Sequence, residues 1–261
     1  MAHTLRVSLE PAWILHQRPY RDSSLLLEVF SRTHGRVVLV ARGARSSRSR
    51  WQGLLQIMRP LALSWSQRGE LGTLTGADGR GQARRVPGRE VLCGCYLNEL
   101  LLRLMTRNDP HPDSFDRYEQ ALGTLAGNEE QALRVFEKQL LQSLGYGLLL
   151  DCEFDSGAAV RAEHWYEYQL ERGPVRLVEQ QPGLCLQGSS LLALHRNELT
   201  DAQACREAKQ LMRAALALYL GARPLRTREV LRQLSTLARE RPQDTGAVTL
   251  DRQDRPARQT G

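Results

Sequence analysis

Four arginines stand close together early in the chain, and a tryptophan follows the last of them directly. They are Arg42, Arg45, Arg48 and Arg50, with Trp51 next. Guanidinium groups form paired hydrogen bonds to phosphate oxygens, and an indole ring can stack on a nucleic-acid base. Glycine and serine residues separate the arginines, as is typical of a loop. The segment is therefore predicted to bind nucleic acid; a plain solvated loop over a buried Trp51 is the alternative.

Three further arginines near the amino terminus are expected to join this surface. Arg18 and Arg21 follow the first predicted strand, and Arg36 precedes the third. We expect them around the same edge of one domain as the arginine loop, with Tyr20 as a second ring for stacking on a base. Such binding would show no sequence preference, because phosphate contacts carry no base information.

A second basic group lies near the carboxyl end and consists of Arg223, Arg226, Arg228 and Arg232. Arg228 and Arg232 are four residues apart, so they share one face of a predicted helix. The amino terminus of that helix adds partial positive charge. We expect a second nucleic-acid-binding surface here, as a protein that holds two strands would need. A solvated helix face is the alternative.

Net charge is unevenly distributed along the 261 residues. Residues 1–90 carry a net charge of +9, residues 91–210 one of −7 and residues 211–261 one of +5. Positive charge at both ends favours a polyanionic partner. No apolar run approaches the roughly 18 residues that a membrane span needs, and the first residues lack the apolar core of a signal peptide. A cytoplasmic protein without a membrane partner is therefore expected.

Residues for catalysis or metal binding are sparse. Asp151, Glu153 and Asp155 alternate, so on a strand they would share one side and resemble a Mg²⁺ cluster; an acidic loop is the plainer interpretation. Cys152 and Cys185 each lack the second cysteine that a structural zinc site normally has three residues on. The chain has no Gly-x-x-x-x-Gly-Lys phosphate loop. We expect no catalytic residues, no metal and no cofactor, and a protein that is not an enzyme.

The first part of the chain is predicted to form a β-barrel. Five short apolar runs separated by turn residues predict strands over residues 13–16, 25–30, 37–41, 61–65 and 71–74. A short helix is expected over residues 51–56, between the third and fourth strands. Five strands with a helix inserted there is the order of an OB-fold, a small barrel that commonly binds oligonucleotides. An SH3-like barrel also has five strands and stays open on pattern alone.

After residue 88 the apolar period becomes helical. Helices are predicted over residues 89–106, 112–125, 129–144, 201–220 and 227–238, and β-like pieces over residues 165–170 and 175–178. The third helix is expected to be capped by Asn128. The apolar stripe that it buries is expected to consist of Leu133, Phe136, Leu140 and Leu144.

These elements predict an α+β chain with two domains and a tail. Residues 1–80 are expected to form the OB-fold barrel, and residues 81–240 a mostly helical domain with a small irregular β insert at about residues 150–190. Residues 241–261 are rich in Gly, Pro, Asp, Arg and Gln, so a disordered tail is expected.

Several segments, in the right order, resemble the RecO family of bacterial recombination mediators. The similar segments are Ala12–Leu25, Gly35–Val37, Ala41–Arg45, Tyr96–Leu101, Leu144–Gly147 and Tyr219–Glu229. The resemblance covers roughly residues 8–235. An ordered set of motifs is far more specific than any one of them.

This resemblance implies an OB-fold followed by a helical domain that carries a Cys-x-x-Cys…Cys-x-x-Cys zinc site in some members. Only Cys152 and Cys185 stand where those pairs would be, so the chain looks like a zinc-free branch with a degenerate zinc-site insert. The resemblance also implies a function in the RecFOR pathway of DNA repair. RecO proteins bind single- and double-stranded DNA, anneal complementary strands and work with RecR to load RecA onto DNA coated by single-stranded-DNA-binding protein. A requirement for RecF stays open.

The resemblance further implies binding of the acidic carboxy-terminal tail of single-stranded-DNA-binding protein. Arg134 matches the arginine that meets this tail, and Lys138 lies one turn further on the same helix. A peptide that ends in an apolar residue and a free carboxylate needs a cation next to a hydrophobic notch, because a surface salt link alone is worth little. The expected protein is cytoplasmic and associates with the nucleoid during repair.

Two other functions remain as alternatives. An OB-fold RNA-binding protein would bind RNA and DNA oligonucleotides equally and would not anneal strands. A metal-dependent nuclease built on Asp151, Glu153 and Asp155 would degrade DNA in the presence of Mg²⁺.

Overall fold

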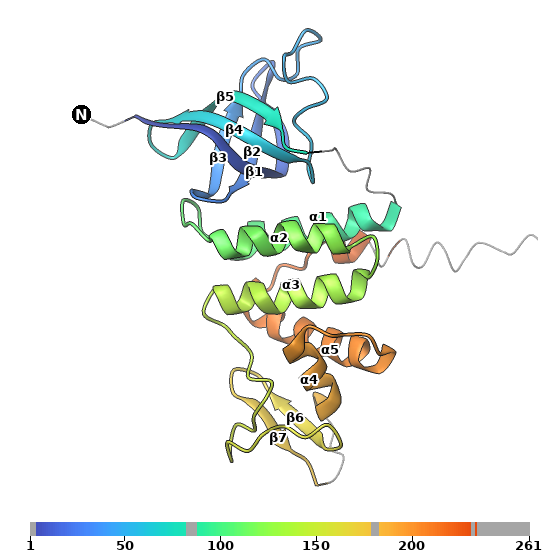
Figure 1. Ribbon diagram of the computed structural model, residues 1–261. Coiled ribbons are helices and arrows are strands. Elements are labelled where there is room, and N and C mark those ends of the chain that lie inside the picture. The colour runs from blue at the N-terminus through green and yellow to red at the C-terminus, as the bar shows by residue number, and fades with distance from the viewer. Residues whose placement is uncertain (1–3, 82–87, 179–182, 231–232, 234–261) are drawn as a thin grey trace, which may run out of the picture.

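The computed structural model describes residues 4–81, 88–178, 183–230 and 233. Its amino-terminal part is a closed barrel with strand order β1-β2-β3-β5-β4 (Figure 1). Strands β3 and β5 pair in parallel, and the other neighbours are antiparallel. The strands are β1 (Leu5–Tyr20), β2 (Ser24–Ser31), β3 (Gly35–Ala41), β4 (Pro60–Gln67) and β5 (Leu71–Gly79). This topology is the OB-fold, as the sequence predicts.

The barrel closes because β1 is long and bends. Its first half pairs with β4 and its second half with β2, and the register shifts between Val7 and Glu10 and again between Ile14 and His16. Such bulges bend a strand and increase its twist. Alternate side chains then fill the barrel interior, among them Leu27, Leu39 and Trp65, all at most 1% exposed.

The short helix expected over residues 51–56 is absent. This stretch is a series of turns, with Gly53 at φ +67°, and Trp51 is only 5% exposed. A backbone with positive φ cannot continue a right-handed helix, and six residues are too few for an isolated helix to be stable.

Helices pack against the outer face of the barrel. Trp13 and Phe30 point outward from β1 and β2 into the core of the helical domain, where their rings lie 5.6 and 6.2 Å from the ring of Tyr118. The Asn98 side-chain amide donates a hydrogen bond to the Leu15 carbonyl at 2.9 Å. Asn98 belongs to α1 (Gly88–Leu104), and Tyr118 belongs to α2 (Pro112–Thr124). The barrel and helical domain therefore share one apolar core rather than a solvated hinge.

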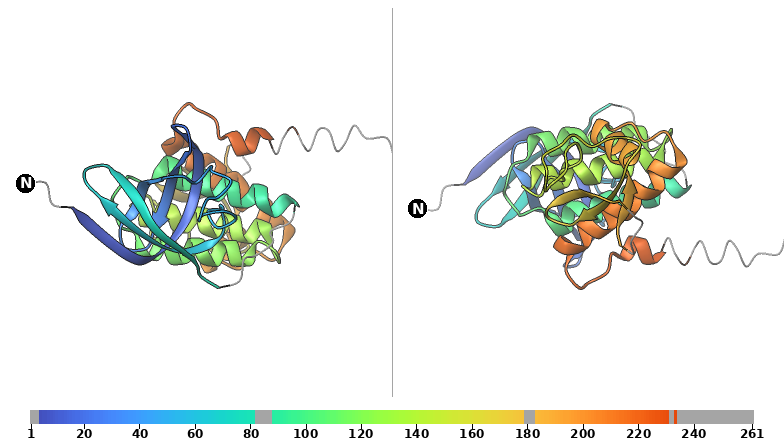
Figure 2. Two further views of the ribbon diagram at one scale, coloured as in Figure 1. Left: turned by 90° about the horizontal axis from the view of Figure 1, so that it is seen from above. Right: turned by 90° about the horizontal axis from the view of Figure 1, so that it is seen from below.

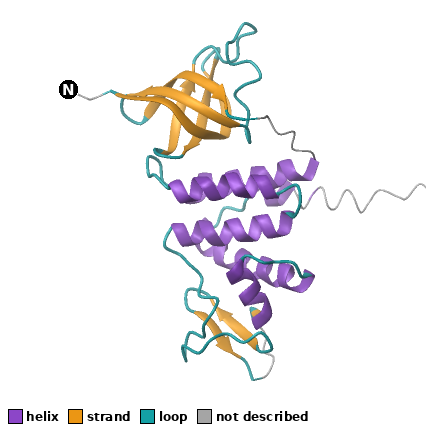
Figure 3. Ribbon diagram, in the orientation of Figure 1, coloured by secondary structure: helices purple, strands orange, loops and turns teal. Residues whose placement is uncertain are grey.

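Three more helices and a small sheet follow α2. The helices α3 (Glu129–Ser143) and α5 (Ala202–Leu220) pack beneath α1 and α2, and α4 (Gly188–Arg196) packs against α5. The sheet has the order β7-β6-β8 and consists of β6 (Trp165–Gln169), β7 (Gly173–Arg176) and β8 (Cys185–Gln187). Figure 3 shows strands at the two ends of the molecule with helices between them; in Figure 2 the barrel lies in front of the helices when seen from above, and the small sheet lies in front of them when seen from below.

The sequence predicts most helices and strands of this second domain but misses α4 and β8. The last expected helix begins at Arg226 and is described as far as Val230, with Gln233 beyond it; the rest of the expected span and the expected disordered tail lie outside the described residues. Asn128 caps α3 as expected, because its side-chain oxygen accepts a hydrogen bond from the Gln131 amide at 3.1 Å. No helix of the described ranges is long and apolar enough to cross a membrane.

The buried face of α3 differs from the expected stripe. Phe136 and Leu140 are buried as expected, whereas Leu133 and Leu144 are partly exposed. The face that packs inward also carries Arg134 and Glu137. Sequence reasoning chose only apolar residues for the stripe, so it could not find a buried ion pair.

Candidate nucleic-acid interface

The arginine loop and the β1–β2 turn lie together at one end of the barrel. Leu25 of β2 pairs with Ala41 of β3, so the residues just beyond that pair are neighbours. The Arg45 backbone amide donates to the Ser23 carbonyl at 2.8 Å, and its guanidinium donates to the Arg21 carbonyl at 3.3 Å. The loop between β3 and β4 projects from the barrel at the end away from the helices (Figure 1). Six arginines at this end are exposed: Arg18, Arg21, Arg42, Arg45, Arg48 and Arg50.

Successive turns hold this loop in place. Gly43 has φ +67°, the Ser46 amide donates to the Gly43 carbonyl at 3.2 Å, and the Ser49 amide donates to the Ser46 carbonyl at 3.0 Å. Tight turns along a loop direct successive long side chains toward solvent, where they can spread over a backbone of phosphates.

Trp51 lies beneath the loop instead of on its surface. Its ring is 5% exposed, its indole nitrogen donates to the Arg42 carbonyl at 3.2 Å, and the Arg50 guanidinium carbon lies 4.1 Å from its centroid. Arg50 also donates to the Thr75 carbonyl at 3.2 Å. The expectation that Trp51 offers a free face to a base is wrong, since the ring is a core residue that anchors the loop, and Arg50 covers it.

Arg36 does not lie beside the arginine loop. It stands at the opposite end of β3 from Arg42, about 20 Å away at the rise of a β-strand. Its side chain is 13% exposed, donates to the Leu102 carbonyl of α1, and lies 3.9 Å from Glu28. Arg107 also binds Glu28, at 2.6 Å. The expectation that Arg36 lies at the same edge of the barrel as the arginine loop is therefore wrong. This arginine instead connects the barrel to the helical domain.

The carboxy-terminal basic group is divided by the fold. Arg223 and Arg226 are exposed. Arg228 points inward, where its guanidinium donates to the Tyr96 hydroxyl at 3.0 Å and lies 5.5 Å from the Tyr96 ring centroid. Arg232 lies outside the described residues. The expectation that Arg228 lies on an exposed helix face together with Arg232 is thus wrong for Arg228.

The positive end of the last helix is not open to a nucleic acid. Glu99 accepts hydrogen bonds from the backbone amides of Arg226 and Thr227 at 2.9 and 3.0 Å, and from the Thr227 hydroxyl at 2.7 Å. The burial of Glu99 by itself raises its pKa, but these hydrogen bonds outweigh burial and the pKa lies below its ordinary value. The carboxylate occupies the position that a phosphate would need.

Arg134 is buried in the helical core. Its guanidinium lies 3.0 Å from the carboxylate of Glu137, and the two side chains are 6% and 0% exposed. The other Glu137 oxygen accepts a hydrogen bond from the Tyr96 hydroxyl at 2.5 Å. Burial raises the pKa of Glu137 against the effect of Arg134, Tyr96 and Arg228. The expectation that Arg134 is an accessible cation is wrong, because this arginine is the counter-ion of a buried carboxylate.

Lys138 is also committed to the fold. Its ammonium donates to the carbonyls of Leu194 and His195, at 2.7 and 2.9 Å, at the end of α4. Burial, and the charge of Arg117 nearby, lower the pKa of Lys138. Cations at the carboxyl end of a helix stabilise its unpaired carbonyls. Lys138 therefore caps α4 and does not lie free for a partner.

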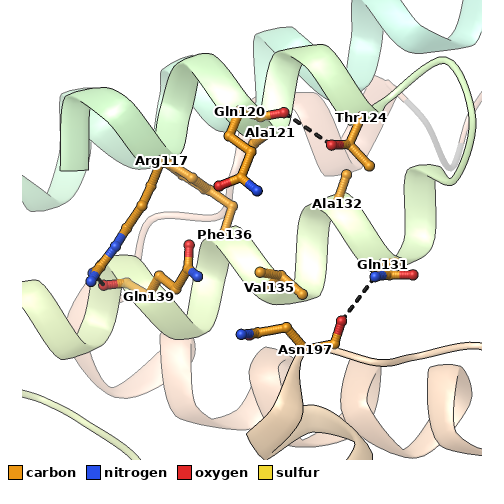
Figure 4. A pocket seen from close by; sticks show the side chains of 10 residues that line it. All are labelled: Arg117, Gln120, Ala121, Thr124, Gln131, Ala132, Val135, Phe136, Gln139 and Asn197. Atoms are coloured by element: carbon orange, nitrogen blue, oxygen red, sulfur yellow. Dashed lines mark hydrogen bonds between the residues drawn. The ribbon is translucent and has the colours of Figure 1, made fainter. Parts of the chain in front are cut away.

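A pocket of about 150 Å³ opens on the other side of α3, against α2 (Figure 4). Ala132, Val135 and Phe136 of α3 and Ala121 of α2 give it an apolar floor. Arg117 lies at one end and Asn197 at the other, and the Asn197 carbonyl accepts a hydrogen bond from Gln131 at 2.8 Å. The pocket thus combines an apolar notch with a partly exposed guanidinium, which donates to the Gln139 carbonyl at 3.2 Å.

Arg117, which lines this pocket, is not singled out by the sequence. Arg117 and Arg134 both lie on predicted helices, and only the direction of each side chain separates them. Glu137, three residues after Arg134, is the one signal in the sequence that points to a pair on the same helix face.

The acidic and cysteine residues of the insert do not form a metal site. Asp151 and Asp155 are exposed, and Glu153 accepts a hydrogen bond from Ser156. Within the ranges that the structure describes, no group of three or more His, Cys, Asp or Glu side chains is placed to hold a metal ion. Cys152 pairs through its backbone with Ala159, and Cys185 belongs to β8. A donor set of two thiols does not fit the four ligands of structural zinc.

The fold and this cationic end define the class: an OB-barrel with an arginine-rich loop, packed against a helical domain. Family models agree, since "Recombination protein O N terminal" matches residues 6–82 and "Recombination protein O C terminal" matches residues 88–229. The chain belongs to the RecO family, as the resemblance in its motifs indicates.

Individual relatives cover nearly the whole chain. A protein of Nitrosococcus oceani named "DNA repair protein RecO" is 47% identical over 246 residues, which are 91% of this chain and 100% of that protein. Proteins of the same name from Alkalilimnicola ehrlichii and Methylococcus capsulatus are 48% and 44% identical over 237 and 232 residues. These matches cover 90% and 88% of this chain, and 94% and 95% of the two relatives.

Proposed function

We propose that this protein is a non-enzymatic mediator of DNA repair and recombination that binds single- and double-stranded DNA and anneals complementary strands. It acts in the cytoplasm at the nucleoid, and it works with RecR to load RecA onto DNA coated by single-stranded-DNA-binding protein. The observation that carries the proposal is the group of exposed arginines at the free end of an OB-barrel, in a chain whose relatives are named DNA repair proteins.

The loop arginines provide affinity without sequence choice. Arg42, Arg45 and Arg48 are exposed, and of these three only the Arg45 guanidinium donates to an acceptor among the described residues, the Arg21 carbonyl at 3.3 Å. Each cation that neutralises a phosphate releases a condensed counterion, so binding should fall steeply with salt. Both single strands and duplexes carry the phosphates that these arginines bind. A sequence-tolerant surface is what an annealing protein needs.

Annealing requires a second strand to be held near the first. Arg223 and Arg226 remain exposed near the carboxyl end and supply a second, smaller cationic surface. We assign them a supporting role, because Arg228 binds Tyr96 and because Glu99 already accepts the hydrogen bonds of the amides at the start of the last helix.

The tail of single-stranded-DNA-binding protein fits the pocket between α2 and α3 better than it fits Arg134. Apolar cavities of about 150 Å³ admit a group the size of benzene, so this pocket can take one apolar side chain. Arg117 at the rim can pair with the terminal carboxylate. This location replaces Arg134 and Lys138 as the proposed contact, since both of those cations are occupied.

An annealing assay tests the proposed function. Complementary strands, each labelled with one member of a fluorescence-transfer pair, are coated with single-stranded-DNA-binding protein, either intact or without its tail. The protein should accelerate pairing of strands coated with the intact protein, and it should have a weaker effect when the tail is missing. Binding of DNA and RNA with equal affinity and no acceleration would favour an RNA-binding protein instead. Loss of labelled DNA with Mg²⁺ would favour a nuclease.

A further inference from the structure

An open hollow lies beside the arginine loop, at the same end of the barrel. It has a volume of about 510 Å³ and is bordered by the β1–β2 turn, the end of β3 and the start of β5. Tyr20, Val40 and Leu71 line its apolar part, and Arg21 and Arg42 line its rim. A hollow of this size is in the range of binding sites for small organic groups.

The floor of the hollow belongs to an apolar cluster on the outside of the barrel. Leu26, Val38 and Val40 alternate with the residues that fill the interior, so they point outward, yet they are only 5–8% exposed. Tyr20 packs against them. Further along the same outer face, Phe30 is covered by the helical domain. At the free end no helix of the described residues covers the face, and the Tyr20 ring and the hollow lie there instead.

Charge around the hollow selects the chemistry of an occupant. The Arg21 guanidinium carbon lies 5.3 Å from the Tyr20 ring centroid, and Arg45 donates to the Arg21 carbonyl. The residues that line the hollow include two arginines and no acidic residue. An occupant should therefore have a flat apolar body and carry negative charge on both sides. A nucleotide within a single strand has this form, whereas an apolar protein side chain lacks the flanking charge.

We propose that this hollow takes one unpaired nucleobase of a bound strand. The base stacks on the partly exposed Tyr20 ring in place of the Arg21 guanidinium, which lies over that ring in the structure, while the phosphates before and after it bind Arg21 and the arginines of the loop. Ser23, Ser24 and Thr73 are among the residues that line the hollow, and a hydroxyl group can both donate and accept a hydrogen bond, so these residues suit donors and acceptors on a base alike. Bases in a continuous duplex are stacked on their neighbours and cannot enter without being flipped out.

This inference rests on the proposed DNA binding and adds a distinction between single strands and duplexes at one site. The loop arginines bind the phosphate backbone of both forms, and only the hollow distinguishes an unpaired base from a base in a duplex. The two properties are separable, because Arg48 lies in the loop and does not line the hollow.

Three probes of equal backbone length test the inference on the full-length protein by fluorescence anisotropy. They are an oligothymidine, a deoxyribose-phosphate chain that has no bases, and a duplex. A base-free stretch is needed along the whole probe, because a strand with one missing base could slide to place another base in the hollow. The variants are Tyr20→Leu, which keeps apolar packing without a ring, Tyr20→Phe, which keeps the ring, and Arg48→Ala. Thermal melting of each variant checks that the barrel is folded.

The wild-type protein should bind oligothymidine roughly 5- to 150-fold more tightly than the base-free chain, the range for stacking one base on an aromatic ring. Tyr20→Leu should abolish most of that preference and leave binding of the base-free chain and the duplex unchanged. Tyr20→Phe should keep it. Equal wild-type affinity for oligothymidine and the base-free chain would overturn the inference, as would a Tyr20→Leu variant that keeps the preference or weakens duplex binding equally. Arg48→Ala should weaken all three probes together, so failure of DNA binding itself is recognised separately.

Discussion

The arginines at the free end of the barrel and those in the helical domain differ in what the fold requires of them. Arg42, Arg45 and Arg48 are exposed and join turns whose hydrogen bonds are formed largely by the backbone. Arg134 and Arg228, by contrast, surround the buried side chains of Glu137 and Tyr96. Arginine content alone therefore does not identify a binding surface. What identifies it is charge that the fold itself does not use.

Stability measurements should show this difference most strongly. Replacing Arg134 by Ala leaves Glu137 buried without its cation, so the free energy of unfolding should fall by about 3–5 kcal/mol. The matched change Arg48→Ala should alter it by no more than about 0.5 kcal/mol. Urea denaturation of both variants beside the wild-type protein measures the two values. Similar losses in both would contradict the assignment of Arg134 to the core.

A second prediction concerns Arg117 of α2, at the rim of the pocket between α2 and α3. Arg117→Ala should weaken binding of the acidic tail peptide by about 1.5–3 kcal/mol, the value for a hydrogen bond to a charged group, and leave binding of naked DNA nearly unchanged. Arg206→Ala, at an exposed position of α5, is the control for loss of one positive charge. Titration of a labelled tail peptide, followed by anisotropy, provides the comparison. Undiminished peptide affinity of Arg117→Ala would exclude the pocket.

The third prediction concerns the docking of the last helix by Glu99. Since the pKa of Glu99 is lowered in the folded protein, its stabilising effect is present above the ordinary glutamate pKa of about 4.3 and is lost as the pH falls through the lower folded-state value. Hydrogen exchange of the amides in residues 226–230 should therefore become faster below about pH 4, relative to its intrinsic rate.

The variant Glu99→Gln supplies the control for that pH dependence. It keeps one oxygen acceptor and lacks the charge, so docking should weaken by about 0.5–2 kcal/mol, as for the loss of a helix cap, at all pH values. An acid-induced loss of protection that persisted unchanged in the variant would assign it to another group.

Much of the fold follows from patterns in the sequence. Alternating apolar residues and tight turns predict all five barrel strands, and residues at a helical period predict α1, α2, α3 and α5. The expected strands are too short: the carboxyl ends of β1 and β5 carry few apolar residues, and the alternating Leu5, Val7 and Leu9 at the start of β1 were not recognised as part of the strand. The small elements α4 and β8 were missed, since nine and three residues give too little pattern to recognise.

The candidate site was less predictable than the fold. The positions of the loop arginines follow from their place between two strands, whereas the accessibility of Arg36, Arg134 and Trp51 depends on which residues pack against them. Arg36 meets the Leu102 carbonyl 66 residues further along the chain, and Arg228 meets Tyr96 132 residues before it. Periodicity within one segment has no information about contacts over such separations.

The dependence of single-strand binding on salt tests the central assignment most directly. A loop variant with Ala at Arg42, Arg45 and Arg48 is compared with a control that has Ala at three exposed arginines of the helical domain, Arg161, Arg196 and Arg206. Both variants lose three positive charges. The slope of log affinity against log salt should fall by roughly 0.7 for each lost phosphate contact, near two in total, in the loop variant and stay close to the wild-type slope in the control. Equal slopes in the two variants would show that net charge, rather than the barrel end, binds the strand.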